Sequence, residues 1–423
     1  MQENGHYIVG LDVGTTKVRC VVGYEDPGTP GINVIGSGEA RNSGGMRKGV
    51  VVNIVNTAQA IDKALDAAER MSGFEVHAAT VSINGAHITG MSSRGVVAAG
   101  AHGHEISEED LARVLDAATI VQMPANQEIL QTTPRSFQLD GQDNIKDPVG
   151  MQGMRLEVDA HVITALAPNV RNLEKAVEMT KTSPRGLAVS SLAAARAVLN
   201  EQHIENGVVL IDLGGTTTNI AVFEDGDLQH VAVLPVGSVN ITNDLAIGLR
   251  TDLAVAEQIK LEHAIGGHRP EKEQGKKVGV THDNEKHEFD IDEIDMIVGA
   301  RLEEIFEMID GELATIKRAG KLPGGAVLTG GGALMKGIEL TAREHLRMSA
   351  RIATLQAGLT DVSGVVHQAD YAVAVGLMLL DSESGGTLTP AGGAKAKPIS
   401  KTSGGGGGGL VKSLGGFLKK LKP

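Results

Sequence analysis

The feature that most constrains the fold is a short motif that occurs twice, 200 residues apart. The first copy reads Asp12-Val-Gly-Thr-Thr-Lys17 and the second reads Asp212-Leu-Gly-Gly-Thr-Thr217. In both copies an apolar segment leads into a D-x-G turn with small hydroxyl residues, and a second apolar segment follows. Because two copies at this spacing indicate a duplicated unit, we predict two related α/β halves that face each other.

Each turn carries residue types that suit a phosphate group. Glycine lets the backbone approach the ligand closely, while hydroxyl and N–H groups bind phosphate oxygens and a carboxylate faces a metal ion. One copy alone would be a weak signal, but two copies that face each other predict a cleft that holds the phosphates of a nucleotide together with Mg²⁺.

Two further segments fit such a cleft. Ala326-Val-Leu-Thr-Gly-Gly-Gly332 reads as a strand that runs into glycines, and 334–346 is predicted to be a helix whose N-terminus would suit polar groups of the nucleotide. Glu257 and Lys260 are three residues apart on a predicted helix, so one face could present both to a ligand. Taken singly, these elements could equally be ordinary tight turns and a surface ion pair.

These motifs resemble the two phosphate motifs and the adenosine motif of the actin-like ATPase superfamily, and 190–199 stands where that superfamily has its first connecting helix. Within it the chain is most similar to the FtsA family of bacterial cell-division proteins, from residue 7 to about 380 and again at the C-terminal tail. The most family-specific part is 105–158, which includes Asp147-Pro-Val-Gly-Met151 and Gly153-Met-Arg-Leu-Glu-Val158.

The resemblance implies an α/β, actin-like two-lobed fold built from duplicated ribonuclease-H-like domains. A small α+β domain is inserted in the first lobe, and an amphipathic helix ends the chain. The expected parts are the first lobe (1–83 and 160–205), the inserted FtsA-type domain (84–159), the second lobe (206–243 and 318–381), a second small subdomain (244–317), a flexible linker (382–409) and a membrane-targeting helix (410–423).

Local patterns predict individual elements. Ser107, followed by acidic residues, is predicted to begin a helix of the inserted domain. Val162–Ala167 is expected to return as a strand to the first lobe. An apolar stripe at helical spacing predicts one long helix in the second small subdomain, with the members Ile294, Ile297, Leu302, Ile305, Ile309 and Leu313.

Composition excludes some classes of protein. The 423 residues carry a net charge of −13, which argues against nucleic acid as the main partner. Cys20 is the single cysteine, so the chain cannot form an intramolecular disulfide, and we interpret Cys20 as a small buried hydrophobic residue.

The composition changes abruptly after residue 381. Residues 382–409 are mostly Gly, Ser, Thr, Pro, Ala and Lys, which cannot bury enough surface to fold, and as a coil they would span roughly 30 Å. On a helical wheel, 410–423 places its apolar side chains within an arc of roughly 120° and its lysines on the other side or at its margin. The apolar members are Leu410, Val411, Leu414, Phe417, Leu418 and Leu421, and the lysines are Lys412, Lys419, Lys420 and Lys422.

This tail is too short to span a bilayer and is expected to lie in the plane of an anionic membrane surface. Four lysines near such a surface contribute about 4 kcal/mol before apolar burial is counted. The alternatives are a terminal helix docked on the parent domain and an artificial addition. The glycine-rich tether disfavours docking, and FtsA proteins end in a similar membrane helix.

The resemblance implies an ATP-binding protein that polymerises at the cytoplasmic face of the cell membrane, at the division site, and anchors filaments of the tubulin-like protein FtsZ there. Asp12 and Asp212 would hold Mg²⁺ through water, and Lys17 would neutralise phosphate charge. Phosphate contacts are expected from Gly14, Thr15, Thr16, Gly214, Gly215, Thr216 and Thr217. Glu257 and Lys260 would flank the ribose or adenine, with Gly330, Gly331 and Gly332 beneath it. Arg301 is expected to contact the C-terminal peptide of FtsZ.

The sequence departs from the family pattern at three places. Ser191 replaces a common proline, Asn219 replaces an acidic residue, and the segment before Arg301 lacks an expected proline. Since no side chain is identified as the base for an attacking water, any ATP hydrolysis is expected to be slow. A sugar-kinase-type or chaperone-type member of the superfamily and a pilus-assembly relative are the alternatives, although none of them explains the tail.

Overall fold

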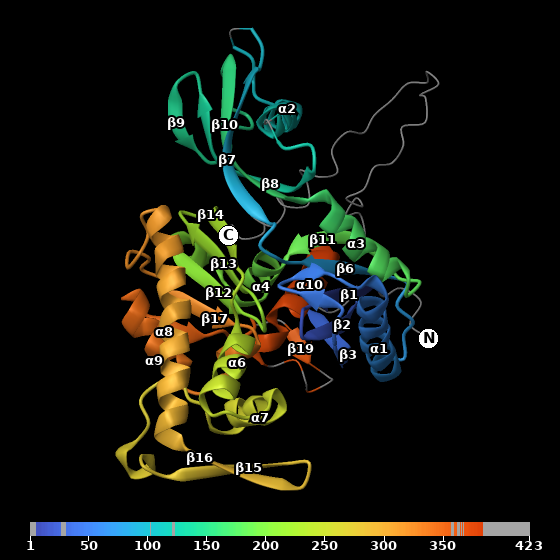
Figure 1. The fold of residues 1–423 in the computed structure, drawn as a ribbon. Coiled ribbons are helices and arrows are strands. Elements are labelled where there is room, and N and C mark those ends of the chain that lie inside the picture. Colours follow the sequence, from blue (N-terminus) through green and yellow to red (C-terminus); the bar gives the residue numbers. More distant parts are fainter. Residues whose placement is uncertain are drawn as a thin grey trace.

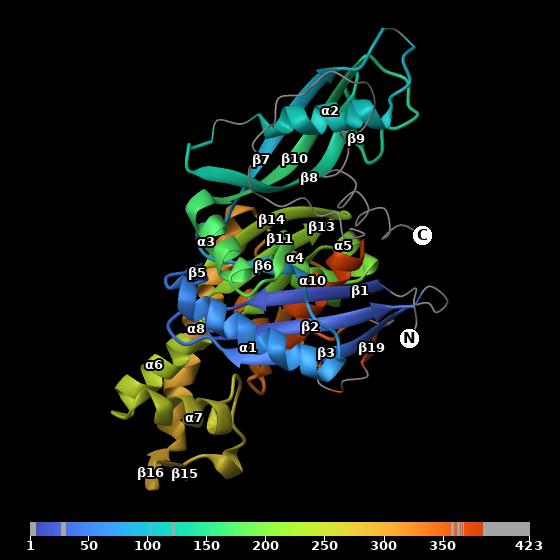
Figure 2. The same cartoon turned by 90° about the vertical axis from the view of Figure 1, so that its right-hand side faces the viewer.

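Two β-sheets form the body of the molecule, a small inserted domain lies above them, and a helical subdomain with a projecting hairpin lies below (Figure 1). The computed structural model describes residues 6–26, 31–101, 103–120, 123–356, 359–361, 364, 366 and 368–383. Seen from the side, the inserted domain and the hairpin lie at opposite ends of an elongated molecule (Figure 2).

The first lobe is built on a six-stranded sheet with the order β11-β6-β1-β2-β3-β19. Its strands are β1 (His6–Val13), β2 (Lys17–Glu25), β3 (Ile32–Arg41), β6 (Ala78–Ile83), β11 (Ser183–Val189) and β19 (Leu359–Asp361). The first three strands are antiparallel neighbours, whereas β6 runs parallel to β1, so the carboxyl ends of β1 and β6 meet at one edge. Cys20 on β2 is fully buried, as predicted, and burial raises the pKa of its thiol to about 12.

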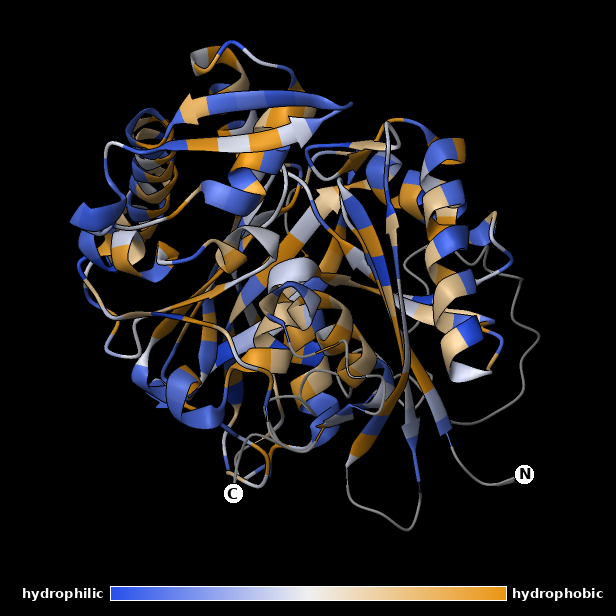
Figure 3. Ribbon diagram, turned by 90° about the horizontal axis from the view of Figure 1, so that it is seen from below, coloured by the Kyte–Doolittle hydropathy of each residue, from blue (hydrophilic) through white to orange (hydrophobic). Residues whose placement is uncertain are grey.

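Helices cover this sheet. They are α1 (Ile54–Ser72), α3 (Ala167–Glu178) and α4 (Ser190–Val198), whereas the short helix α5 (Glu201–Asn206) leads on to the second lobe and packs there. A two-stranded ribbon of β4 (Met46–Arg47) and β5 (Val50–Val51) precedes α1. Helix α1 begins where the side chain of Asn53 accepts a hydrogen bond from the backbone N–H of Asn56, and it ends at Gly73 in the left-handed conformation. Hydrophobic residues are concentrated in the strands and inner helices, while outer helices alternate in character (Figure 3).

The second lobe repeats this plan with the strand order β14-β13-β12-β17-β18. Its strands are β12 (Val208–Leu213), β13 (Thr218–Glu224), β14 (Asp227–Leu234), β17 (Ala326–Thr329) and β18 (Ala350–Ile352). Here too the first three strands are antiparallel and β17 runs parallel to β12. The duplication that the sequence motif predicted is therefore confirmed in the topology of the two sheets.

Three short segments close the second lobe. They are the 3₁₀ turn η2 (Gly331–Leu334), helix α9 (Ile338–Leu346) and the 3₁₀ turn η3 (Ala369–Tyr371). The helix that follows, α10 (Ala372–Glu383), returns to the first lobe and lies on its sheet. The prediction of a helix over 334–346 is wrong at its start, because the backbone of Gly337 is left-handed and the α-helix begins only at Ile338. Helix α10 is almost wholly buried and packs against both α4 and β1.

The helical subdomain comprises α6 (Ser238–Gly248), α7 (Leu253–His263), the 3₁₀ turn η1 (Glu271–Glu273), the hairpin β15 (Lys277–His282) and β16 (Glu285–Asp290), and α8 (Ile291–Thr315). The predicted apolar stripe is confirmed, since five of its six members are fully buried along α8 and Ile297 is partly buried against the same core.

The inserted domain is a four-stranded sheet with one helix on one face. Its elements are β7 (Thr89–Ala98), α2 (Glu108–Thr119), β8 (Gln127–Leu139), β9 (Gln142–Ile145) and β10 (Arg155–Leu166), and the strand order is β7-β10-β8-β9. Ser107 begins α2 with a capping box, as predicted. The segment 162–167 links the two parts, because β10 continues to Leu166 and Ile163 still pairs with both β7 and β8, while the side chains of Ile163 and Ala165 lie in the core of the first lobe.

Candidate functional site

The two D-x-G turns have the same backbone geometry and touch each other. In the first turn the N–H of Gly14 donates to the carbonyl of Lys17 at 3.1 Å, and in the second the N–H of Gly214 donates to that of Thr217 at 2.9 Å. A side chain added to Gly215 would lie 2.5 Å from Cγ2 of Thr16, so the absence of a side chain at Gly215 allows this contact. The structure therefore brings the two predicted motifs together at the junction of the two lobes.

Asp12 lies at the carboxyl end of β1 and is held by the neighbouring strand. The hydroxyl of Ser82, on β6, donates to Oδ1 of Asp12 at 2.8 Å and accepts from the N–H of Val13 at 2.8 Å. Burial raises the pKa of Asp12, and the hydrogen bond from Ser82 and the charge of Arg19 oppose that rise.

Asp212 lies at the matching end of β12 and is buried. Its Oδ2 accepts a hydrogen bond of 2.8 Å from Nδ2 of Asn219 on β13. Burial first, and then the negative charge of Asp12, raise the pKa of Asp212 to about 6. The charge of Asp12 therefore acts on Asp212 across the junction of the two lobes.

This pair of acids fits a hard divalent cation. Mg²⁺ prefers oxygen ligands and usually keeps several waters, so one or two carboxylates suffice when phosphate oxygens complete the shell. Within the described residues no group of three or more His, Cys, Asp or Glu side chains could hold a metal ion by itself. Asp12 and Asp212 are the residues that could hold Mg²⁺ here, provided that water and phosphate oxygens supply the other ligands.

The threonine hydroxyl groups of the two turns differ in the hydrogen bonds that they make. Thr15 accepts from the N–H of Gly49 at 2.9 Å, and Thr217 accepts from Nδ2 of Asn84 at 3.1 Å, so both hydroxyls keep a proton to donate. The hydroxyl of Thr216 is buried and makes no hydrogen bond within the described part of the chain. Lys17 is partly exposed and forms an ion pair of 2.6 Å with Glu39, so its ammonium would have to leave Glu39 to reach a phosphate.

Glu257 and Lys260 share one face of α7 and form an ion pair with each other. Nζ of Lys260 lies 2.7 Å from Oε2 of Glu257 and 2.9 Å from the hydroxyl of Thr242 on α6. Lys260 is only 8% exposed, so this is not an ordinary surface ion pair.

The third glycine cluster packs directly on the second turn. Gly330 has φ +85° and ψ 171°, and a Cβ there would lie 2.4 Å from Oδ1 of Asp212. Gly332 packs on the side chain of Leu213, whereas a Cβ on Gly331 would meet open space. The α-helix begins only at Ile338, so the backbone next to Asp212 comes from a 3₁₀ turn and not from an α-helical N-terminus.

Two of the three departures from the family pattern lie in the interior. Ser191 at the start of α4 and Asn219 on β13 are at most 1% exposed, and the hydroxyl of Ser191 and Oδ1 of Asn219 have no hydrogen-bond partner among the described residues. Sequence reasoning missed Ser82 and Asn84. They could have been identified from their position, because they lie at the carboxyl end of a strand that neighbours β1, and ligands of such sheets bind at that edge.

Arg301 lies on α8 and is already engaged within the subdomain. Its guanidinium pairs with Asp244 on α6, through Nη2 at 3.0 Å, and with Glu304 at 2.5 Å. A partner at this position would therefore compete with two internal carboxylates.

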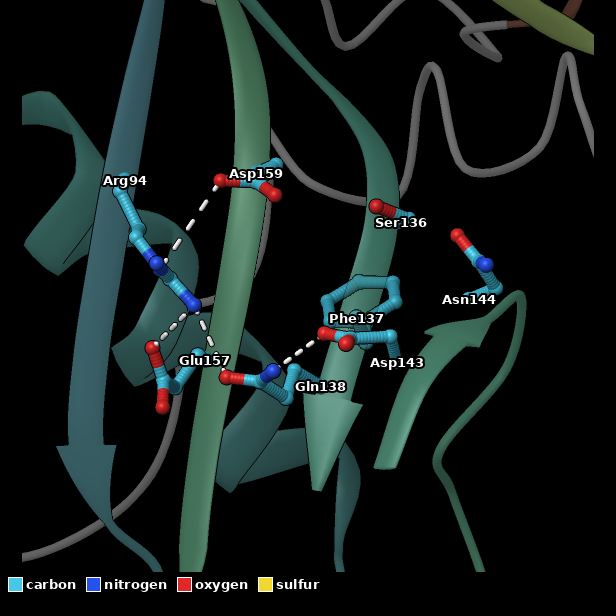
Figure 4. Close-up of a pocket in the computed structure, with 8 residues that line it drawn as sticks. All are labelled: Arg94, Ser136, Phe137, Gln138, Asp143, Asn144, Glu157 and Asp159. Atoms are coloured by element: carbon cyan, nitrogen blue, oxygen red, sulfur yellow. Dashed lines mark hydrogen bonds and ion pairs between the residues drawn. The ribbon is translucent and has the colours of Figure 1, made fainter. Parts of the chain in front are cut away.

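The predicted linker beyond Glu383 and the whole predicted membrane helix, 410–423, lie outside the described residues. No helix in the described part of the chain is long and apolar enough to cross a membrane. A cavity of about 190 Å³ is lined only by residues of the inserted domain, with Arg94 between Glu157 and Gln138 (Figure 4), and contains no residue of the predicted site.

Comparisons with known proteins agree along almost the whole chain. A family model described as cell division protein FtsA matches residues 209–376, and a model described as the SHS2 domain inserted in FtsA matches residues 85–164. Cell division protein FtsA of Pseudomonas aeruginosa is 37% identical over 380 residues, which cover 89% of each chain. The protein of the same name from Bacillus subtilis is 40% identical over 353 residues, covering 83% of this chain and 79% of that protein.

Solved structures show the same fold at low identity. A chain of a PilM–PilN type IV pilus biogenesis complex has a TM-score of 0.64 at 16% identity and covers 88% of this chain and 98% of that chain. MreB5 of Spiroplasma citri bound to ADP has a TM-score of 0.54 at 12% identity, with 89% and 96% covered. These likenesses concern the fold alone.

Proposed function

Because the chain belongs to the cell division protein FtsA family, we propose that it is an ATP-binding, actin-like protein that polymerises at the cytoplasmic face of the membrane and anchors FtsZ filaments at the division site. The predicted actin-like two-lobed fold with an inserted domain is confirmed, and the chain is a cell-division protein. The finer parts of this proposal concern the nucleotide, the membrane and FtsZ, and each has its own support.

The observation that carries the nucleotide proposal is the contact between the two D-x-G turns, which places Asp12 and Asp212 on either side of one junction. Each turn offers backbone N–H groups and hydroxyls to phosphate oxygens, and the two acids offer oxygen ligands to Mg²⁺. The MreB5 structure, which shares the fold, was solved with bound ADP, which supports a nucleotide as the kind of ligand proposed.

The residues at the junction favour binding over rapid hydrolysis. Thr15, Thr216 and Thr217 can donate hydroxyl protons to phosphate oxygens, and Asn219 holds Asp212 in a fixed orientation. A general base must lie within hydrogen-bond reach of the water that it activates. Both junction carboxylates are committed to the proposed ion, so slow turnover remains our expectation.

Calorimetry tests the nucleotide proposal directly. Titration of the full-length protein with ATP in the presence of Mg²⁺ should show binding at one site, and EDTA should weaken it. Absence of ATP binding by the wild-type protein would contradict the nucleotide proposal.

The membrane part rests on the pattern of 410–423. An apolar arc with lysines on the opposite side suits the surface of an anionic bilayer, and polymerisation would strengthen attachment by presenting many tails at once. Co-sedimentation with anionic liposomes, with and without FtsZ, measures tether and partner together. Deletion of Leu410 to Pro423 should abolish liposome binding and leave ATP binding intact, and flotation of the deleted protein at wild-type yield would refute the anchor.

The FtsZ part rests on Arg301 and the family resemblance. Arg301→Glu should weaken binding of the FtsZ C-terminal peptide, more strongly at low salt than at high salt. Since this change also places a third acid beside Asp244 and Glu304, the matched control is Asp244→Asn, which removes the internal pair but keeps the arginine. Peptide affinity equal to wild type in Arg301→Glu at low salt would remove Arg301 from the site.

A further inference from the structure

The inserted domain belongs to the first lobe by chain connection, yet it also holds the second lobe. Its strands β7, β8 and β10 all contact β14, the outermost strand of the second sheet (Figure 1). Two basic side chains make the polar part of this contact, Arg135 from β8 and Lys146 from the loop after β9. Both bind the segment 225–229, which spans the β13–β14 turn and the start of β14.

Two β-bulges face each other at this contact. On β8 the pairing with β10 jumps from Ser136 to Pro134, which leaves Arg135 without a partner residue. On β14 the pairing with β13 jumps from Leu228 to His230, which leaves Gln229 unpaired. A bulge re-aims a side chain and interrupts the ladder, so one bulge presents the guanidinium and the other presents carbonyl groups.

The guanidinium of Arg135 joins the two bulges. Its Nε donates to the carbonyl of Leu228 at 3.0 Å, and its Nη2 donates to the carbonyl of Gln229. On the side of the inserted domain, Nη1 donates to the hydroxyl of Ser92 at 2.9 Å, and Nη2 lies 2.7 Å from Nδ1 of His161. The planar fork of arginine is suited to such simultaneous contacts, whereas a lysine could satisfy only part of them.

The histidine behind Arg135 is held neutral. His161 is 2% exposed, and burial together with the charge of Arg135 lowers its pKa to about 3. A neutral imidazole whose Nδ1 accepts from Arg135 carries its proton on Nε2. His161 therefore orients the guanidinium without adding a second positive charge.

Lys146 adds a second attachment at the tip of the same hairpin. Its ammonium donates to the carbonyl of Asp225 at 2.5 Å and forms an ion pair with the side chain of Asp227. The ammonium is half-exposed while Asp227 is mostly buried, so water weakens this contact more than that of Arg135.

The hairpin that these residues grip runs directly to the second phosphate turn. Strand β13 begins immediately after Thr217, and β14 leads to Gly237 at the start of α6. There the N–H groups of Ser238 and Val239 donate to the carbonyls of Gly214 and Gly215 at 2.9 and 2.7 Å. The β13–β14 turn therefore contacts the inserted domain, and the other end of the hairpin contacts the phosphate turn that follows Asp212.

We propose that the inserted domain is an inter-lobe clamp, in which Arg135 and Lys146 hold the β13–β14 hairpin and thereby oppose the separation of the lobes that nucleotide release requires. The link to release rests on the proposed nucleotide site, whereas the clamp itself does not. By the reciprocity of coupled sites, a nucleotide that draws the lobes together also tightens the grip on the hairpin.

Nucleotide release is the first measurement. Full-length wild-type protein, Arg135→Ala and Lys146→Ala are loaded with a fluorescent ATP analogue and Mg²⁺, then chased with excess ATP. Arg135→Ala should release the analogue about 10-fold faster, because it loses hydrogen bonds from a charged donor, and Lys146→Ala should have a smaller effect. The matched control is Arg94→Ala on the same sheet, whose contacts with Gln138, Glu157 and Asp159 all lie within the inserted domain.

Hydrogen exchange of the nucleotide-free proteins is the second measurement, and it does not depend on ATP. Arg135→Ala should speed amide exchange both in β14 and in the turn 214–217, and Arg94→Ala should change neither. Arg135→Lys keeps the charge without the fork and should give an intermediate increase, which covers the case in which Arg135→Ala fails to fold.

The two measurements separate the possible failures. A wild-type protein that binds no nucleotide refutes the proposed function, while exchange still decides about the clamp. Exchange in Arg135→Ala and Arg135→Lys equal to that in Arg94→Ala overturns the clamp. Faster exchange limited to β14, with the turn 214–217 unchanged and release at the wild-type rate, overturns its coupling to the site.

Discussion

The two phosphate turns share a backbone but differ in what stands opposite their acids. Asp12 pairs across β1 and β2 with Arg19, and Asp212 pairs across β12 and β13 with Asn219, at the same register position. Arg19 is a buried cation whose charge opposes the rise that burial causes in the pKa of Asp12, while Asn219 is a neutral amide that donates one hydrogen bond to Asp212. The duplicated position thus carries a charge in one lobe and none in the other.

The neighbouring parallel strands differ in the same way. Ser82 on β6 donates to Asp12, whereas Thr329, which pairs with Asp212 in register on β17, donates to the carbonyl of Ala369 at 2.5 Å. The first acid is therefore held by its neighbour strand and the second by its own hairpin. The difference teaches that duplication preserves the turn, which depends on local backbone geometry, while the groups that set each acid's charge diverge.

The largest expected effect comes from the glycine that lies against the second acid only. Gly330→Ala should lower the free energy of unfolding by about 3 kcal/mol or more, because its backbone conformation is one that only glycine adopts readily and the new methyl group would collide with Asp212. Thermal unfolding and ATP binding measure the loss. Gly331→Ala is the matched control, since its Cβ would meet open space; equal stability of the two variants would show that the second turn tolerates displacement.

The next effect separates the two register-equivalent residues. Arg19→Gln should cost about 3–5 kcal/mol, because it leaves Asp370, which lies 2.5 Å from the guanidinium, as a buried charge without its cation. Asn219→Ala should cost only about 1–3 kcal/mol, the usual penalty for a buried acceptor that loses one partner. Chemical denaturation compares the two variants, and equal losses would refute the distinction between a charged and a neutral support.

A third prediction concerns the acids themselves. Asp12→Ala and Asp212→Ala should each weaken Mg²⁺-dependent ATP binding about 10-fold or more, since each removes a charge that the ion needs. Calorimetry with Mg²⁺ and with EDTA separates the metal-dependent part. Undiminished binding in either variant would assign the ion to the other acid alone.

The smallest expected effect lies at the end of the first turn. Lys17→Ala should change the free energy of unfolding by less than about 1 kcal/mol, because the ion pair with Glu39 is partly exposed to solvent. Thr217→Val, at the corresponding position of the second turn, should lower the free energy of unfolding by about 1 kcal/mol, because the side-chain amide of Asn84 loses its hydrogen-bond acceptor. Denaturation at low and high salt distinguishes the two variants. Salt screens the ion pair of Lys17, so the stability difference between Lys17→Ala and the wild type should disappear as salt rises, whereas that of Thr217→Val should persist.

Much of the fold followed from local patterns. The repeated motif predicted two related halves, the capping signal placed the start of α2 at Ser107, and the apolar stripe predicted α8. An error arose where the local pattern was ambiguous, because glycines before 338 allow a 3₁₀ turn where a helix was expected.

The sequence by itself determined the two turns, their residue types and the duplicated architecture, because backbone sterics, glycine content and apolar periodicity act over a few residues. Only the tertiary structure decided which groups meet. Arg19 binds Asp370, which lies 351 residues away in the sequence, and Arg135 binds the carbonyl of Leu228, which lies 93 residues away. The physical reason is that partner choice depends on strand order, bulges and burial, which arise only when distant segments pack, and these partners set the charge and the rigidity of the site.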